Sequence, residues 1–547
     1  MGGLNTPAVS PNQPLGRPGA IEMLAVLVGA AILLAPTLSY RMGVDQGAFA
    51  YIGDQLLAGR WPYLGTWESD YPGMMFLQAL ELLLFGRSIV MFRVFDVLFQ
   101  LGIVIFLYLT ARRLSGRGAG VLGVGLYCLI YQGYGPWNTA QREGFGLLFV
   151  MLALWLLITR MRRDWWKTAG GIGVALGTAA LFKPTLLALA AFALPLAWPI
   201  DRRVIRSGLV AGLAAAAPAL ILIALYAVLG GLKEMYEALV SYTPIYTARL
   251  RGDDPTLVFW MSKLGSLGTT TWAVALLGFP LMFLGPSKRE IRFVYAGYLG
   301  AGLGVFVQGT FAGYHYLPGL AFGALLIGYG YSVAAAWCVR RLTALPRRMG
   351  KLGVRMRDRA NRWQTGVAVV IVALLIPIYV NPVAVGRLVS GQFLGPPEPG
   401  EFTNGTVFDF TESYEVAQYL RQHTDPTDVI QVWGYEALVY YLAERGAASR
   451  FQMTHPLVMR VPGEALTEMQ QAWRREFIED MRQREPKFVA VVREDNWWWA
   501  PGEQTSEQLL SDFVEFESLI GDRYVHDRDI GRFRVFRIAS TPVAEGR

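Results

Sequence analysis

The chain has 547 residues and a net charge of +8, and 53% of its residues are hydrophobic while only 17% are charged. A soluble globular protein carries about 25% charged residues, so this composition indicates a membrane protein. In a membrane protein a basic excess reports loop orientation, which argues against nucleic acid as a partner. The two cysteines lie inside apolar runs and there are four histidines, which argues against a disulfide framework and a metal cluster.

The N-terminal segment, residues 1–20, is rich in Pro, Gly and Asn, and we expect it to be disordered. The apolar run Ile21–Tyr40 that follows is about as long as a bilayer requires. It is too long for the core of a signal peptide and has no small-residue cleavage site. We therefore predict a retained transmembrane helix.

Further apolar runs along the chain predict about eleven spans in a transmembrane domain over residues 21–385. The later predicted spans are Ser88–Ala111, Ala119–Tyr134, Glu143–Thr159, Thr168–Phe182, Thr185–Trp198, Val204–Leu229, Leu264–Leu284, Ile291–Thr310, Tyr316–Val339 and Gly366–Val380.

The apolar run Tyr71–Phe85 is short for a span, and the basic loops decide whether it crosses. If it does not cross, the loops such as Arg112-Arg113 and Arg202-Arg203 all fall on one side, which the positive-inside rule makes the cytoplasm. If it crosses, all of these loops lie outside. We therefore expect a juxtamembrane or re-entrant helix on the outer face of a multi-pass inner (plasma) membrane protein, with a cytoplasmic N-terminus.

The C-terminal part of the chain reads as a soluble domain, residues 406–547, after a Pro/Gly-rich linker, residues 386–405. Helical periodicity alternates with strand patterns, which favours a small extracytoplasmic α/β domain. The strands are expected at Val429–Trp433, Phe488–Val492 and Phe533–Ile538, and the helices at Ser413–His423, Glu436–Glu444, Leu466–Arg484 and Glu507–Ile520. It contains no catalytic motif, and the triplet Trp497-Trp498-Trp499 favours contact with the membrane interface or the transmembrane domain.

Polar residues gather on the side that this topology places outside. Asp45 follows the first span, and it is either a solvated loop carboxylate or a general base at the membrane surface. The same loop adds Asp54, Glu68 and Asp70 among aromatic residues, which suit either interface anchoring or sugar rings.

Charged residues at the outer ends of later spans have two readings as well. Arg93 and Asp96 have the i, i+3 spacing of a self-neutralising pair, but Arg93 also fits a ligand site. Ionisable groups at membrane depth are costly and tend to line functional cavities, although each could snorkel to lipid headgroups. The others are Arg142, Glu143, Lys183 and His315.

The order and spacing of these elements resemble the bacterial GT-C glycosyltransferases. These enzymes use polyprenyl-phosphate sugars and are related to the protein O-mannosyltransferases and the aminoarabinose transferase of lipid A. The likeness rests on Asp45, Gly59-Arg60-Trp61-Pro62-Tyr63, Asp70-Tyr71-Pro72-Gly73, Leu84-Phe85-Gly86, Arg93-Val94-Phe95-Asp96, Gln141-Arg142-Glu143-Gly144, Lys183-Pro184 and Gly313-Tyr314-His315-Tyr316.

The resemblance implies that Asp45 is the catalytic base of an inverting transfer from a polyprenyl-phosphate-linked sugar donor to an extracytoplasmic acceptor. Gln46 stands where many members have a second acid, and no cation precedes Tyr71-Pro72, where many have a phosphate-binding lysine. Donor and phosphate binding then falls to Arg142, Glu143, Lys183, His315, Asp70 and Arg93. The chemistry needs neither a nucleotide nor a metal, so no cofactor is expected.

Three alternatives stay open from the sequence. A transporter or flippase of lipid-linked saccharides accounts for the spans, but the chain shows no matched halves with broken helices. A glycan polymerase or ligase would favour a large polar loop late in the membrane part, whereas here it comes first. A catalytically silent scaffold would scatter the polar residues over separate faces. The sugar, the acceptor and the length of the lipid are not specified by the sequence.

Overall fold

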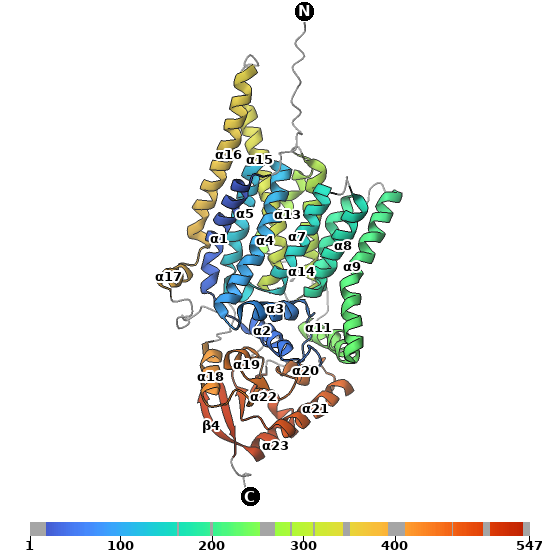
Figure 1. Ribbon diagram of the computed structural model, residues 1–547, viewed down its shortest axis with the longest axis vertical. Coiled ribbons are helices and arrows are strands. Elements are labelled where there is room, and N and C mark those ends of the chain that lie inside the picture. Colours follow the sequence, from blue (N-terminus) through green and yellow to red (C-terminus); the bar gives the residue numbers. More distant parts are fainter. Residues whose placement is uncertain are drawn as a thin grey trace, which may run out of the picture.

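The computed structural model describes residues 18–160, 164–196, 201–251, 268–284, 287–309, 312–342, 350–391, 411–461, 463–495 and 504–539. They form a bundle of apolar helices with a small α/β domain at one end, and α2 and α3 lie between the two (Figure 1). The predicted fold class, a polytopic helical membrane domain followed by a small α/β domain, is confirmed.

Within the described residues, seven helical segments are long and apolar enough to cross a membrane. They are α1 (Ala20–Leu34) with the 3-10 helix η1 (Ala35–Ser39), α4 (Ile89–Ser115), α7 (Arg142–Arg160), α9 (Arg202–Leu229), α14 (Lys288–Gln308), η4 (Gly313–Tyr316) with α15 (Leu317–Leu342), and α16 (Gly350–Tyr379). Large aliphatic side chains such as Leu213 and Ile221 of α9 are exposed on the outside of the bundle, as expected of a surface that faces lipid.

Other predicted spans form helices that are shorter or less apolar. They are α5 (Arg117–Gly133), α8 (Trp165–Phe182), η2 (Pro184–Leu196) and α13 (Gly268–Leu281). η2 differs from a standard span because it is a 3-10 helix with Pro184 at its start and Pro195 inside it. α8 packs tightly on α9: a Cβ on Gly173 would lie 2.2 Å from the carbonyl oxygen of Ala211, so only glycine permits this approach.

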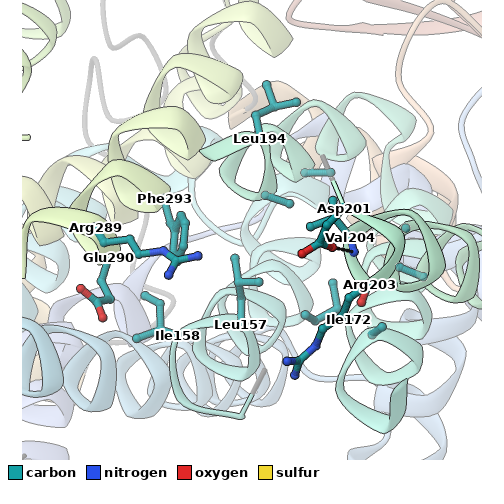
Figure 2. Close-up of a pocket in the computed structure, with 16 residues that line it drawn as sticks. Leu157, Ile158, Ile172, Leu194, Asp201, Arg203, Val204, Arg289, Glu290 and Phe293 are labelled. Atoms are coloured by element: carbon teal, nitrogen blue, oxygen red, sulfur yellow. Dashed lines mark hydrogen bonds between the residues drawn. The ribbon is translucent and has the colours of Figure 1, made fainter. Parts of the chain in front are cut away.

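The two ends of the bundle differ in charge. At one end, the guanidinium groups of Arg112 and Arg117 pair with Glu22, at 2.6 and 2.9 Å. Near this end α7, α8, η2, α9 and α14 surround a mainly apolar cavity of about 580 Å³ (Figure 2). Its charged lining residues are Asp201, Arg203, Arg289 and Glu290. We call this the basic end, and we call the opposite end, where the α/β domain lies, the domain end.

Two helices and a loop connect the bundle to the α/β domain. α2 (Val44–Leu57) leads into the first loop, residues 58–72, and then into α3 (Gly73–Phe85). α3 is amphipathic: Leu80 and Leu83 are exposed, whereas Gln78 and Glu81 are fully buried. With 13 residues it is shorter than the helices that can span a membrane, in agreement with the surface helix predicted at Tyr71–Phe85.

Short helices complete the domain end of the bundle. They are α6 (Gly135–Asn138), α10 (Leu232–Tyr236), the π-helix η3 (Glu237–Ser241), α11 (Thr243–Arg251) and α17 (Pro382–Ser390). α17 continues past residue 385, where the sequence predicted a linker to begin. Most of that linker, residues 1–17 of the N-terminal segment and the Trp497–Trp499 triplet lie outside the described residues.

The C-terminal domain has a five-stranded mixed sheet in the order β2-β1-β3-β5-β4. β1 is parallel to β2 and β3, and β5 is antiparallel to β3 and β4. The strands are β1 (Val429–Trp433), β2 (Gly446–Ala447), β3 (Phe488–Val492), β4 (Tyr524–Ile530) and β5 (Phe533–Ile538). The helices are α18 (Thr411–Gln422), α19 (Leu438–Ala443), α20 (His455–Val458), α21 (Glu468–Arg484), α22 (Ser506–Ser511) and α23 (Val514–Arg523).

This domain is docked firmly on α2 and the first loop. The Tyr51 ring of α2 stacks on Tyr440 of α19 with centroids 5.1 Å apart, and its hydroxyl accepts a 2.8 Å hydrogen bond from the Ala447 amide. The Trp67 amide donates to the Arg450 carbonyl at 2.7 Å. A single hydrophobic core extends from the bundle through α2 into the sheet, so the first loop is held between two folded units.

Candidate active site

Asp45 lies in the first turn of α2, at the end of the bundle that faces the C-terminal domain. Burial raises the pKa of its carboxyl, and the nearby Glu143 carboxylate adds to this, while Arg142, Lys183 and Gln141 oppose it. The N-terminus of a helix carries partial positive charge and favours a carboxylate there. Asp45 is therefore held among charged groups from distant parts of the chain.

Arg142 and Glu143 face Asp45 from the start of α7, and both side chains are almost fully buried. The Arg142 guanidinium pairs with Asp70 of the first loop and lies 5.3 Å from the Phe49 ring centroid. Arginine is unfavourable in the first turn of a helix, so its presence here needs the carboxylates around it.

Lys183 and His315 complete the cluster from two further elements. Lys183, between α8 and η2, pairs with Glu143, and Nε2 of His315 lies 3.6 Å from Oε1 of Glu143. The Lys183 ammonium is 5.6 Å from the Tyr314 ring centroid, and the Tyr314 ring meets the His315 ring edge-on. Glu143 thus connects α8, η4 and α7 at one point.

Glu68 of the first loop belongs to this cluster, a role that the sequence did not assign to it. It is 4% exposed and accepts hydrogen bonds from the amides of Ser69 and Asp70 at 2.8 and 3.3 Å. Burial raises its pKa to about 7; Arg142 and the Ser69 amide lower it, and Asp45 raises it further. The carboxyl at this position is therefore a group that titrates near neutral pH.

Two tyrosines from separate elements lie near enough to the carboxylates for their pKa to respond to the carboxylate charge. Burial and the Asp45 charge raise the pKa of Tyr246 on α11 to about 12. Tyr435, which follows β1 in the C-terminal domain, also has a raised pKa from burial and from Asp45 and Glu68. The C-terminal domain therefore contributes a side chain to the site. Neither role could be predicted from the sequence, because tyrosine is common at membrane interfaces.

The cluster contains buried polar atoms that other protein groups do not satisfy. Among the described residues, Nε of Arg142 and Oε2 of Glu143 have no hydrogen-bond partner, although buried polar groups are normally paired. Within the described part of the chain, neither Asp45 nor Glu68 forms an ion pair. An arrangement with two cations, four carboxylates and unsatisfied donors and acceptors is suited to a polar ligand with an anionic part.

Arg93 does not join this cluster, although the sequence offered it as a phosphate-binding residue. It is fully buried and directed at protein backbone: Nε donates to the Tyr40 carbonyl at 3.2 Å and a terminal nitrogen donates to the Pro136 carbonyl at 2.9 Å. The expected pair with Asp96 is also replaced, since Asp96 accepts instead from Tyr131 and Gln100.

No group of three or more His, Cys, Asp and Glu side chains in the described ranges is arranged to hold a metal ion. The cavity in Figure 2 is not part of the Asp45 cluster, since its lining residues come from the basic end.

The comparisons with known proteins agree with this architecture. The family described as dolichyl-phosphate-mannose-protein mannosyltransferase matches residues 69–228. No curated protein sequence matches the chain. The structure of ArnT from Cupriavidus metallidurans bound to undecaprenyl phosphate is 15% identical, with a TM-score of 0.57 over 96% of this chain and 99% of that one. The chain has a GT-C fold.

Other solved structures are similar as well. The apo state of the same ArnT is 14% identical, with a TM-score of 0.51 over 94% of this chain and 97% of that chain. The apo oligosaccharyltransferase from Archaeoglobus fulgidus is 14% identical, with a TM-score of 0.47 over 95% of this chain and 75% of that one. The resemblance seen in the sequence is confirmed, and the likeness to ArnT establishes the GT-C fold over nearly the whole chain.

Proposed function

We propose that the protein is a membrane-embedded inverting glycosyltransferase that moves a sugar from a polyprenyl-phosphate donor to an extracytoplasmic acceptor. The observation that carries this proposal is the convergence of Asp45, Arg142, Glu143, Lys183 and His315, from four separate parts of the chain, on one site at the domain end. The dolichyl-phosphate-mannose family match over residues 69–228 supports the class of donor.

In the proposed reaction Asp45 is the general base. It accepts the proton of the acceptor hydroxyl while the hydroxyl oxygen attacks the anomeric carbon. The bond between that carbon and the phosphate oxygen breaks on the opposite face, so the configuration inverts and the lipid phosphate leaves with the bonding electrons. Partial burial of Asp45 raises its pKa and makes the carboxylate a stronger base than a solvated one.

Arg142 and Lys183 provide the positive charge that the departing phosphate requires. Each is paired with a carboxylate, Arg142 with Asp70 and Lys183 with Glu143. The unsatisfied Nε of Arg142 is a free donor for a phosphate oxygen. Such fixed donors stabilise charge that develops in the transition state without having to reorganise.

Orientation follows from the charges at the two ends. Basic residues at the C-terminal end of α4 and at the starts of α5 and α9 lie at the end opposite the C-terminal domain. Under the positive-inside rule this charge pattern supports a cytoplasmic position for that end and an extracytoplasmic position for the site and the domain. This supports a lipid-linked donor in the outer leaflet.

The decisive experiment replaces Asp45 with Asn in the purified protein and assays sugar transfer from a panel of undecaprenyl-phosphate sugars. We expect D45N to lower kcat about 100-fold or more, because general bases contribute about that much. The matched control is Asp54→Asn on the same helix, whose carboxylate pairs with Arg87 at 2.6 Å. Wild-type turnover in D45N would remove Asp45 from the role of base. Movement of intact lipid-linked sugar across vesicles without any transfer would favour a flippase.

A further inference from the structure

Two segments that carry the proposed site residues are joined to each other by buried polar side chains. The first, residues 40–43, leads directly into Asp45, and the second, residues 135–140, leads directly into Arg142 and Glu143. They are about ninety residues apart in sequence and approach each other where α4 begins, at the domain end.

Arg93 of α4 links the two segments through one guanidinium group. Its nitrogens donate to the carbonyls of Tyr40 and Arg41 on the first segment. They also donate to the Pro136 carbonyl at 2.9 Å and to the Thr139 hydroxyl at 3.1 Å on the second. The rigid fork of donors on arginine fixes both direction and distance, which a flexible lysine ammonium does not.

Gln46 makes the same connection from α2. Its Oε1 accepts from the Gly43 amide at 2.6 Å. Its Nε2 donates to the carbonyls of Pro136, Trp137 and Thr139, at 2.8, 3.3 and 2.6 Å. The residue directly after Asp45 is therefore used to attach α2 to the second segment, and it is fully buried.

The second segment is supported again one helical turn further along α4. Ala140 has a φ of 54°, a left-handed conformation that is uncommon for alanine. Its amide donates to the Tyr131 hydroxyl at 2.8 Å, and that hydroxyl donates to Asp96 at 2.7 Å. Arg93 and Asp96 thus lie on one face of α4, and both support residues 135–140.

We propose that Arg93 and Gln46 are positioning residues that hold Asp45 at a fixed place relative to Arg142 and Glu143. They do not touch the reacting atoms. This inference rests on the proposed transferase function for its kinetic consequence, but its structural consequence is independent of it. Without these hydrogen bonds the two segments are free to move relative to each other, and Asp45 loses its alignment with Arg142 and Lys183.

The test compares Arg93→Lys with Arg112→Lys in the full-length protein in nanodiscs. Arg112 is a matched control because it is a buried arginine on the same helix, at the basic end, paired with Glu22. We expect R93K to lower kcat between about tenfold and a hundredfold, because a misplacement near 1 Å has that effect, while KM for the lipid donor changes little. R112K leaves both constants close to wild type.

Hydrogen exchange supplies a readout that needs no activity. In R93K the amides of residues 40–47 and of residues 135–143 should exchange faster together, and in R112K neither segment should change. Gln46→Ala is the second variant in case R93K does not fold, and it should give the same paired change. Unchanged exchange in both segments, or wild-type kcat in R93K, would overturn the proposal that Arg93 and Gln46 hold the two segments together. If the wild type transfers no sugar but exchange rises in both segments of R93K, the transferase proposal fails, while the positioning role of Arg93 is still supported.

Discussion

Glu143 is the residue on which the charge balance of the site depends. It pairs with Lys183 and lies 3.6 Å from the His315 imidazole, while its second oxygen has no partner among the described residues. A phosphate that binds Lys183 competes with Glu143 for the same ammonium. In the absence of phosphate, Glu143 keeps the buried ammonium paired, which avoids the large cost of an unpaired ion.

The two carboxyls of Asp45 and Glu68 should be visible in the pH dependence of the reaction. Burial raises the pKa of both, and the Glu68 value is about 7. The base must be ionised to work, so activity falls as the pH is lowered. Because the two groups interact, we expect kcat/KM to fall through two ionisations in the wild type and through one in Glu68→Gln.

The measurement is a pH profile of kcat/KM for the lipid donor in three proteins. The third is Glu507→Gln, a carboxylate of the C-terminal domain that pairs with Arg534 far from the site. It should keep the wild-type profile. If kcat/KM of E68Q still falls through two ionisations at low pH, the second ionisation belongs to a group other than Glu68.

The sequence identified most of the charged residues of the candidate site but not how they are directed. Asp45, Arg142, Glu143, Lys183 and His315 stand out because charges at the ends of apolar runs need a reason. Arg93 stands out equally, yet it faces backbone carbonyls. Glu68 and Tyr435 enter the site only through contacts between elements far apart in sequence, which local patterns do not report.

At the level of elements, α3 combines an exposed apolar face with a polar face that is buried against the rest of the molecule. Within the part of the chain that the structure describes, the amide of Gln78 and the carboxyl of Glu81 have no hydrogen-bond partners, and neither does the hydroxyl of Tyr441 on α19. Burial raises the pKa of Glu81 to about 8 from an ordinary value of 4.5. The folded state therefore favours the neutral carboxyl at this position.

This shift makes stability depend on pH in a defined direction. Because the pKa of Glu81 is higher in the folded protein than in the unfolded chain, its neutral carboxyl contributes its full stabilisation below pH 4.5. That contribution is lost as the pH rises through about 8. Glu81→Gln removes the loss, so we expect its unfolding temperature to match wild type near pH 4.5 and to exceed it by a few degrees near pH 8.

Thermal unfolding at the two pH values checks this, with Glu415→Gln on the exposed side of α18 as the control. An equal difference between E81Q and wild type at both pH values would contradict it.

The elements that the sequence predicted well are those with strong apolar patterns. β1, β3 and β5 have the expected bounds, because the pattern of a buried strand is simple. β4 escaped prediction since it is an edge strand, Tyr524–Ile530, with charged residues that suppress pairing with other chains. The predicted helix Glu507–Ile520 is divided into α22 and α23, a break that periodicity alone did not indicate.

At the scale of the whole molecule, Trp67 lies at the centre of the contact between the C-terminal domain and the bundle. It is 1% exposed, and its ring meets Tyr242 of the bundle as well as His455 and Trp473 of the domain, with centroids 5.0 to 5.6 Å apart. Gln452 donates to the Trp67 carbonyl and accepts from its amide. The first loop, the bundle and the domain meet at this one side chain.

Trp67→Ala should therefore weaken docking. Truncation of a buried tryptophan typically lowers stability by about 3–5 kcal/mol. Here the loss would weaken the interface between the bundle and the C-terminal domain. We expect faster proteolysis within the first loop and reduced transfer activity. Trp363→Ala, at a position that is 74% exposed, is the control and should behave as wild type. Resistance of W67A to protease equal to wild type would show that the domain is held elsewhere.

The burial of Trp67 also fixes when the site is finished during synthesis. A ribosome makes the chain from its N-terminal end, so Asp45 and Trp67 exist long before His455 and Trp473 are polymerised. Until His455 and Trp473 have been made, the Trp67 ring lacks two of its contacts, and Tyr435 becomes available only shortly before them. The first span and the first loop of a nascent chain are thus made early, whereas the surroundings of Asp45 and Trp67 are complete only after the C-terminal domain has been synthesised.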